Sequence, residues 1–367
     1  MKSPREVADD LRAFERVAPR YMFHYNYICG ACLEQQHTFI ETKPGPTRRE
    51  VSVIWPTNRP YACMLTFHRA APGEEWDRLP NREFYINLDY LNALLTYLKG
   101  SGWEIVSIDQ MIERLARSGK RRLVNFSIDD GYVDTFEHVI PLFRSFGVPV
   151  TLFITTGIPD ETDLLGWAGL ETIISERETL LTSMGKVDVS DLPAKRRWFT
   201  RIAASWGEQN FDQAYQDFCR INGADVPELR KRHAITWRML ESLKDDPLVE
   251  IGAHTISHAR ISSLPIPAAL HELRDSAARL RQRLGVPCRH FAFPYGRMRD
   301  CGVRDFLLTR EAGFVSAATT IRGLVKPGQD LFQLPRNNMN GAYQSLIYAK
   351  ASLTGLSGVV AKVLRRG

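Results

Sequence analysis

The chain has 367 residues, of which 44% are hydrophobic and 25% are charged, and its formal net charge is +6. This length allows one large α/β domain with additions, or two ordinary domains, and the composition is that of a soluble globular protein. No long basic block with interleaved aromatic residues is present, which argues against nucleic-acid binding. We attribute the mildly basic balance to a solvated surface.

The first twenty residues carry charges throughout and lack the apolar segment of a secretory signal. No uncharged apolar run in the chain approaches the ~18 residues that a membrane span requires. The six cysteines are too few for a disulfide framework in a chain of this length. We therefore expect a cytoplasmic protein with reduced thiols, with the inner membrane surface as the alternative location.

Residues 1–58 are predicted to form an irregular, partly helical N-terminal extension. It contains a CxxC pair flanked by two histidines, and this spacing is compatible with zinc. The four residues are His24, Cys29, Cys32 and His37. A single CxxC with two histidines is a weak signal, and we favour ordinary packing for it.

From residue 59 to about 342, strand and helix patterns alternate, which is typical of βαβ units in a parallel sheet or barrel. Apolar runs predict strands at 61–68, 103–108, 123–128, 149–154, 248–255, 288–296 and 314–320, with a last strand end at 331–336. A mainly helical insertion interrupts the pattern at about 158–236. Residues 343–367 form a predicted helical tail with a basic end, for which we favour docking on the body over weak binding to a membrane surface.

Polar residues gather at the carboxyl ends of these predicted strands. In a (β/α) barrel these ends form one rim, and active sites are built there. The rim residues are His68, Asp129, Asp130, Thr155, Thr156, His254, Tyr295 and Arg336. These side chains could act together in one reaction, so we favour one shared site over a chance gathering of polar residues.

Asp129 and Asp130 end the buried strand LVNFSI, and two neighbouring carboxylates in such a place repel each other unless something compensates them. In an extended strand their side chains would point to opposite faces. Gly131 frees the backbone, so that both carboxylates can reach one cavity. One of them can then bind a metal while the other stays free as a base.

His254 and His258 are four residues apart, so both imidazoles can face one cation. Alone, such a pair is more often a capping or core pair. Two histidines with one carboxylate are, however, a standard catalytic ligand set for Zn²⁺ or a similar divalent ion. Zinc makes water a nucleophile near neutral pH. A backbone N–H near residues 294–296 could then support an oxyanion, and His68 could protonate a leaving amine.

Three segments together resemble the polysaccharide deacetylases, carbohydrate esterase family 4 with the NodB-homology domain. They are SIDDG (127–131), HTISH (254–258) and RHFAFPYG (289–296). The resemblance spans about 61–340 and implies an α/β fold, a distorted (β/α)₇ TIM-like barrel, and metal-dependent removal of an N-acetyl group from a sugar. Position by position, it implies the base at Asp129, metal ligands at Asp130, His254 and His258, a base-orienting Arg289, and an oxyanion-supporting backbone N–H at Tyr295.

Many family members carry their catalytic acid, a histidine, in a late segment, whereas this chain has no histidine after His290. The branch with the acid on an early strand is more similar, because LTFHRA (65–70) resembles its early segment. This implies His68 as the acid and places Arg336 near the base.

The leading hypothesis is therefore a metal-dependent carbohydrate N-deacetylase, with Zn²⁺ as the first choice of metal and Co²⁺, Ni²⁺ or Fe²⁺ as alternatives. A cytoplasmic member of the family would act on a lipid-linked or nucleotide-linked N-acetylated sugar in the synthesis of surface polysaccharide or glycolipid. The rival hypotheses are an O-acetyl ester deacetylase and a carbohydrate-binding protein without turnover. The complete Asp130, His254 and His258 set argues against the second rival.

Overall fold

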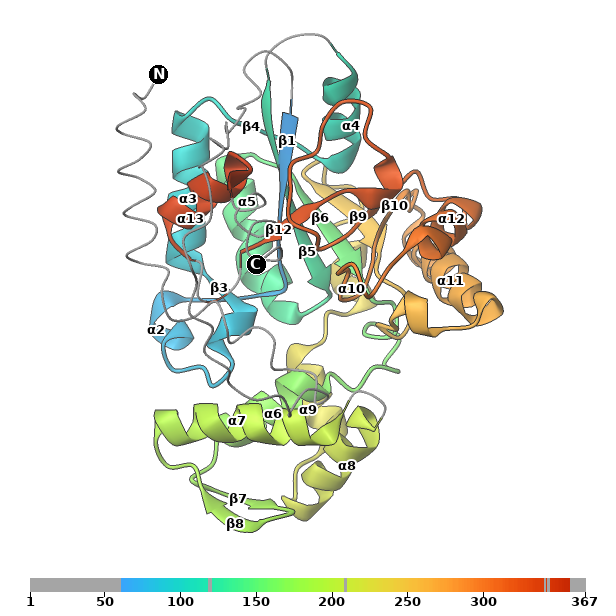
Figure 1. Cartoon of the computed structure of the whole chain (residues 1–367). Coiled ribbons are helices and arrows are strands. Elements are labelled where there is room, and N and C mark those ends of the chain that lie inside the picture. The colour runs from blue at the N-terminus through green and yellow to red at the C-terminus, as the bar shows by residue number, and fades with distance from the viewer. Residues whose placement is uncertain (1–60, 118–120, 208–209, 340, 342–343, 357–367) are drawn as a thin grey trace, which may run out of the picture.

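The computed structural model describes residues 61–117, 121–207, 210–339, 341 and 344–356 (Figure 1). The predicted N-terminal extension, its histidine and cysteine cluster, and the basic end of the tail lie outside these residues. The domain boundaries given above stay a prediction. Among the described residues, no helix combines the length and apolar character needed to cross a bilayer.

A nearly closed barrel of seven parallel strands forms the body of the protein. In sheet order the strands are β11 (Ser316–Ala318), β10 (His290–Ala292), β9 (Val249–Ala253), β6 (Val150–Ile154), β5 (Arg122–Asp130), β1 (Tyr61–Phe67) and β12 (Arg336–Asn338), and the two-residue β4 (Glu104–Ile105) also pairs with β5. Leu334 closes the ring, because its N–H donates to Ala317 at 3.0 Å and its carbonyl accepts from Thr319 at 2.8 Å. The expected distorted (β/α)₇ barrel is confirmed.

Helices surround this barrel. Those of the outer layer are α3 (Leu88–Gly100), α5 (Ile140–Phe146), α10 (Trp237–Glu241), α11 (Ile266–Leu284), α12 (Val303–Glu311) and α13 (Leu346–Leu353). The strand residues that point outward, among them Leu65, Phe126 and Leu152, share one large core cluster with apolar residues of these helices. A π-helical turn, Thr135–Val139, precedes α5.

Short elements follow β1 before α3. They are β2 (Arg69–Ala71), α2 (Gly73–Trp76), a 3-10 turn at Arg82–Phe84 and β3 (Tyr85–Asn87), and β2 pairs with β3 in a small parallel sheet. Two further 3-10 turns lie at Ile261–Ser263 and Leu331–Gln333. The last of these corrects the prediction for 331–336, because only Arg336 of that segment belongs to a strand.

The helix α4 (Ile108–Ala116) closes the barrel at the amino ends of the strands. Its buried residues Met111 and Leu115 share an apolar cluster with the inward-facing Met64, Leu123 and other barrel residues. Figure 1 shows α4 at one end of the barrel and the insertion at the other. The amino end of the barrel is therefore a packed floor, and the carboxyl end is the mouth.

The insertion has its own apolar core. It consists of α6 (Gly166–Ser175), β7 (Thr179–Thr182), β8 (Gly185–Asp188), α7 (Leu192–Trp206), α8 (Phe211–Ile221) and α9 (Val226–His233). Ile173, Phe199, Phe218 and Leu229 are buried together in a cluster separate from the two barrel clusters. The antiparallel hairpin β7–β8 is an addition to the helical character predicted for this segment.

An ionic cluster around the buried His290 ties the floor helix to the strands. His290 Nε2 lies 3.2 Å from Asp109 of α4 and 3.4 Å from Glu250 of β9, and its Nδ1 lies 2.9 Å from the Ser316 hydroxyl. Glu250 also accepts hydrogen bonds from the Ile108 and Asp109 backbone and from the Thr151 hydroxyl. Burial lowers the pKa of His290, but the two carboxylates outweigh that effect and raise it to about 8.

We expect His290 to make the stability of the protein depend on pH. Because its folded-state pKa is raised, its contribution is complete below the unfolded pKa of about 6.5 and is lost as pH rises through about 8. We predict that His290→Gln loses on the order of 1–2 kcal/mol relative to wild type at about pH 6 and much less at about pH 9.5. Urea unfolding at both pH values measures the difference.

The control for this prediction is His271→Gln, which removes an exposed ion pair with Asp275. Solvent screens that pair, so the control should show little pH-dependent difference. An equal stability loss for His290→Gln at both pH values would contradict an ionised His290 in the folded protein.

Candidate metal centre and active site

The carboxyl end of β5 delivers two carboxylates into the barrel mouth in different directions. Inward-facing Leu123, Asn125 and Ser127 lead to Asp129 by the alternation of the strand. Asp130 then adopts a left-handed conformation with φ of 78°, and Gly131 follows with φ of 124°. The sequence assigned this turn to Gly131 alone, whereas it begins at Asp130 itself.

Positive φ angles also occur at other residues around the site. Besides Asp130, the non-glycine residues Thr255, His258 and Tyr295 have φ values of 69°, 55° and 61°. Such conformations cost free energy in L-residues and persist where surrounding contacts hold them, often at functional sites. The loops after β5, β9 and β10 each contain such a residue at the barrel mouth.

Asp130, His254 and His258 form a compact group, which we call the metal triad. Asp130 Oδ1 lies 3.4 Å from His254 Nε2 and 3.3 Å from His258 Nε2, and the three ligand atoms lie within 4.8 Å of one another. Ligands bound tetrahedrally at about 2.0–2.1 Å are separated by about 3.3–3.4 Å. The spacing in the metal triad therefore fits a divalent ion of this kind.

Two further observations support that fit. Asp130 Oδ1 is buried and has no hydrogen-bond partner among the described residues. His254 Nδ1 lies 2.7 Å from the Ala292 carbonyl, so Nδ1 carries a proton and Nε2 is the ring nitrogen turned toward Asp130. Burial raises the pKa of Asp130, but the imidazoles of His258 and His254 outweigh it and hold the pKa well below its usual value.

Asp129 is compensated separately, by Arg336. Arg336 Nη1 and Nη2 donate to the two oxygens of Asp129 at 2.6 and 2.8 Å. The guanidinium is fully buried and also donates to the Thr319 carbonyl and to the hydroxyls of Thr66 and Ser127. Burial raises the pKa of Asp129, but the Arg336 charge outweighs that effect and keeps it below its usual value. Asp129 is therefore an ionised carboxylate outside the metal triad.

The expectation for Arg289 is wrong. Arg289 precedes β10 and lies at the floor of the barrel, where its Nε is 3.2 Å from Asp109, and half of its side chain is exposed. Asp129 lies at the opposite, carboxyl end of β5. Because β10 runs from the floor to the mouth, a residue that precedes β10 lies far from the site, whereas the residues that follow β10 reach it. Arg336 is the arginine that contacts Asp129.

His68 follows the last residue of β1 and faces the site. Its ring stacks on Phe84 with 4.8 Å between centroids and an interplanar angle of 25°. Its Nδ1 is buried without a hydrogen-bond partner among the described residues. Burial lowers the pKa of His68, and the charges of Asp130 and Asp129 oppose that change.

The remaining rim residues have different surroundings. The ring of Tyr295 lies 5.1 Å from that of His258, and the Tyr295 carbonyl accepts a hydrogen bond from Thr320 at 2.6 Å. Thr155 donates its hydroxyl to the His254 carbonyl, and its N–H donates to the Asp130 carbonyl. Thr155 thus supports the backbone of two triad residues and does not present its side chain to the cavity.

Sequence reasoning missed Arg69 and Asp134 beside this site. Arg69 Nε donates to Asp134 Oδ2 at 2.8 Å, and both side chains are nearly inaccessible to solvent. Two features of the sequence could have indicated these residues. Arg69 directly follows His68 in an apolar segment, and Asp134 is the third aspartate of DDGYVD.

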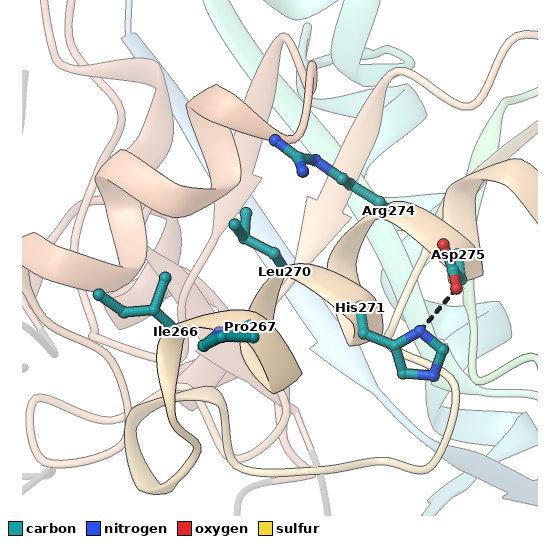
Figure 2. A pocket seen from close by; sticks show the side chains of 6 residues that line it. All are labelled: Ile266, Pro267, Leu270, His271, Arg274 and Asp275. Atoms are coloured by element: carbon teal, nitrogen blue, oxygen red, sulfur yellow. Dashed lines mark ion pairs between the residues drawn. The ribbon is translucent and has the colours of Figure 1, made fainter.

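An open groove of about 420 Å³ lies elsewhere, on the outer surface of α11 (Figure 2). Its lining residues are Ile266, Pro267, Leu270, His271, Arg274 and Asp275. None of them belongs to the barrel mouth. The groove is therefore a feature of the outer helical layer and not of the site.

Comparison with known proteins agrees with this fold. The family profile described as polysaccharide deacetylase matches residues 116–305, which is more than half of the chain. The chain therefore belongs to the polysaccharide deacetylase family. It is a carbohydrate deacetylase, a hydrolase whose substrate is an acetylated carbohydrate.

Solved structures of deacetylases share the fold at low sequence identity. A de-N-acetylase from Aggregatibacter actinomycetemcomitans aligns with a TM-score of 0.51 and 13% identity over 80% of this chain and 99% of its own. IcaB from Ammonifex degensii gives 0.50 and 17% over 80% and 99%. The deacetylase PplD of Streptococcus pyogenes gives 0.50 and 14% over 76% and 92%. No curated protein sequence matches the chain significantly.

We predict that the metal triad, and not Asp129, determines metal affinity. Replacing an outer-shell partner of a ligand typically costs 10–100-fold in affinity, so losing a ligand should cost at least about 100-fold. His258→Ala and Asp130→Ala should therefore lose zinc in equilibrium dialysis followed by elemental analysis. Asp129→Asn, the matched control one residue away, should keep it. Full zinc binding by His258→Ala would contradict this assignment.

Proposed function

We propose that the protein is a metal-dependent carbohydrate N-deacetylase that hydrolyses the N-acetyl group of a lipid-linked or nucleotide-linked sugar to acetate and a free amine. The proposal rests mainly on one observation. The two neighbouring carboxylates of β5 have separate partners, Asp130 in the metal triad and Asp129 on Arg336. A site that must both bind a cation and abstract a proton needs this separation of roles.

Asp130, His254 and His258 would hold the ion, most simply Zn²⁺, with Co²⁺, Ni²⁺ or Fe²⁺ as alternatives of the same ligand preference. When bound, it would supply Lewis-acid activation of the attacking water and of the acyl carbonyl. The ligand set offers three protein donors, which leaves coordination positions for these oxygens.

Asp129 would accept the proton of the attacking water. Arg336 donates one hydrogen bond to each oxygen of Asp129, which fixes the plane of the carboxylate. Each oxygen keeps a further lone pair that can accept the proton. The water oxygen adds to the acetyl carbon, and the negative charge that develops on the acyl oxygen would receive support from the Tyr295 backbone N–H.

His68 would act as the general acid. The C–N bond breaks only if the nitrogen leaves as a neutral amine, so a proton must reach it. His68 lies at the end of β1, beside the strand that carries Asp129, and its buried Nδ1 has no partner among the described residues. Its proton would pass to the amine nitrogen as acetate departs.

The proposal predicts the products of a direct assay. Candidate N-acetyl sugars, supplied free, lipid-linked and nucleotide-linked, are incubated with wild-type protein and with Asp129→Asn. Mass spectrometry should show loss of one acetyl group from at least one carrier class with wild-type protein only. Loss of acetyl from O-acetylated sugars alone would instead identify an ester deacetylase. No turnover by metal-loaded protein would favour a carbohydrate-binding role.

The role of His68 predicts a difference between amide and ester substrates. An activated ester has a leaving group that departs without a proton, whereas an amide does not. We therefore expect His68→Ala to lower amide hydrolysis by about 10²–10⁴-fold and hydrolysis of an activated aryl acetate far less. Zinc content measured on the same preparations controls for damage to the metal triad. Equal losses on both substrates would contradict an acid role for His68.

A further inference from the structure

The residue after the proposed acid, Arg69, is the centre of a buried polar cluster that the mechanism above does not use. Its side chain is 6% exposed. Nε donates to Asp134 at 2.8 Å, Nη1 lies 3.5 Å from Glu171, and Nη2 lies 3.1 Å from His233 Nδ1. Asp134 follows β5, whereas Glu171 and His233 lie on α6 and α9 of the insertion. We call these four residues the Arg69 cluster.

The hydrogen bonds fix the protonation of His233. A guanidinium only donates, so His233 Nδ1 must accept, and Nε2 then carries the proton and donates to the Thr172 hydroxyl at 2.7 Å. Burial and the Arg69 charge lower the pKa of His233 to about 3, which agrees with a neutral ring. His233 is therefore an oriented acceptor for Arg69.

Glu171 connects the insertion to three points of the segment that follows His68. Its Oε2 accepts the Tyr85 hydroxyl at 2.5 Å and lies near Arg69, and its Oε1 accepts the Asn81 N–H at 2.9 Å. Burial raises the pKa of Glu171 above its usual value, and Arg69 and the hydrogen bonds from Tyr85 and Asn81 offset only part of that rise. One side chain of the insertion thus holds β2, β3 and the loop between them.

A continuous set of ring contacts runs from this cluster to His68. The Arg69 guanidinium lies 4.4 Å from the Tyr85 ring centroid and 4.6 Å from that of Tyr132. Tyr132 meets Phe84 edge to face at 6.0 Å, and Phe84 stacks on His68. Among the described residues His68 Nδ1 has no hydrogen-bond partner, so the stacking on Phe84 and the backbone of Arg69 help to position the imidazole.

The insertion also touches the strand end that carries the two aspartates. Ala234 forms an antiparallel bridge with Tyr132, and the Ile235 N–H donates to the Gly131 carbonyl at 3.0 Å. On the same side, Asp134 Oδ1 accepts the Ala70 N–H at 2.9 Å. The base-bearing turn and the acid-bearing segment are therefore held by the same helical unit.

We propose that Glu171 and His233 of the insertion are positioning residues for His68 that act through Arg69. The inference rests on the proposed function, in which His68 protonates the leaving amine. A displacement of about 1 Å at a catalytic group can cost about 100-fold in rate. Loss of an Arg69 partner should therefore impair the step that needs the acid and spare steps that do not.

The test uses the full chain with bound zinc and the substrate pair used for His68. Glu171→Gln removes the charge opposite Arg69 at constant side-chain size. We expect kcat for the N-acetyl amide to fall about tenfold or more, with KM changed less than about twofold and activated-ester hydrolysis and zinc content unchanged. Glu171→Asp, which keeps the charge, should retain more amide activity than Glu171→Gln.

His233 provides an independent pair of variants. His233→Leu removes the acceptor for Arg69 and should show the same amide-selective loss. His233→Gln keeps a side-chain oxygen that can accept from Arg69, so it should retain more activity than His233→Leu. This pair also tests the inference if Glu171→Gln does not fold.

The matched control is Glu176→Gln. Glu176 caps the end of α6 and pairs with Arg232 of α9 at 2.8 Å, so this variant breaks an ion pair between the same two helices without touching the Arg69 cluster. It should leave the amide and ester rates unchanged. Thermal unfolding of every variant shows how much of any loss is global destabilisation.

Two results separate the inference from the proposed function. If His68→Ala is amide-selective but the Glu171 and His233 variants lower amide and ester hydrolysis equally, or lower neither, the positioning inference is wrong and the acid role stands. If His68→Ala itself is not amide-selective, the acid role is wrong and the positioning inference fails with it.

Discussion

The structure depends on how two adjacent buried carboxylates at the end of β5 are kept ionised. Asp129 and Asp130 are both buried, and their two charges would repel each other without compensation. A left-handed turn at Asp130 directs the two side chains to different partners, Arg336 and the imidazoles of the metal triad. Each carboxylate then has compensating partners of its own, as the two roles proposed for them require.

The barrel explains why those partners are available. Parallel strands deliver residues distant in sequence to one rim, so His68, Asp129 and His254 meet there, and Arg336 reaches Asp129 from the start of β12. The opposite end is filled by α4 and closed by the ionic cluster around His290. Stability and chemistry thus occupy different ends of one sheet.

The insertion is more than a cover over the mouth. It has its own apolar core, yet its buried polar residues contact the barrel beside His68 and beside the turn after Asp130. Buried ion clusters add little net stability compared with apolar packing, but breaking one leaves an uncompensated charge. The positioning role proposed for the Arg69 cluster agrees with this balance better than a role in stability alone.

The sequence by itself determined the alternation of strands and helices, the rim residues and the family, because apolar periodicity and short segments such as SIDDG and HTISH are local properties. It identified His68 as a rim residue and expected Arg336 near Asp129, but it placed Arg336 at the end of a strand, whereas Arg336 begins β12. It also assigned the base-orienting role to Arg289, which lies at the floor. Only the tertiary structure decided which arginine meets Asp129, that Asp130 begins the turn, and that Glu171 and His233 reach Arg69. These contacts join residues far apart in the chain, and their geometry follows from strand direction and barrel closure, which no local pattern encodes.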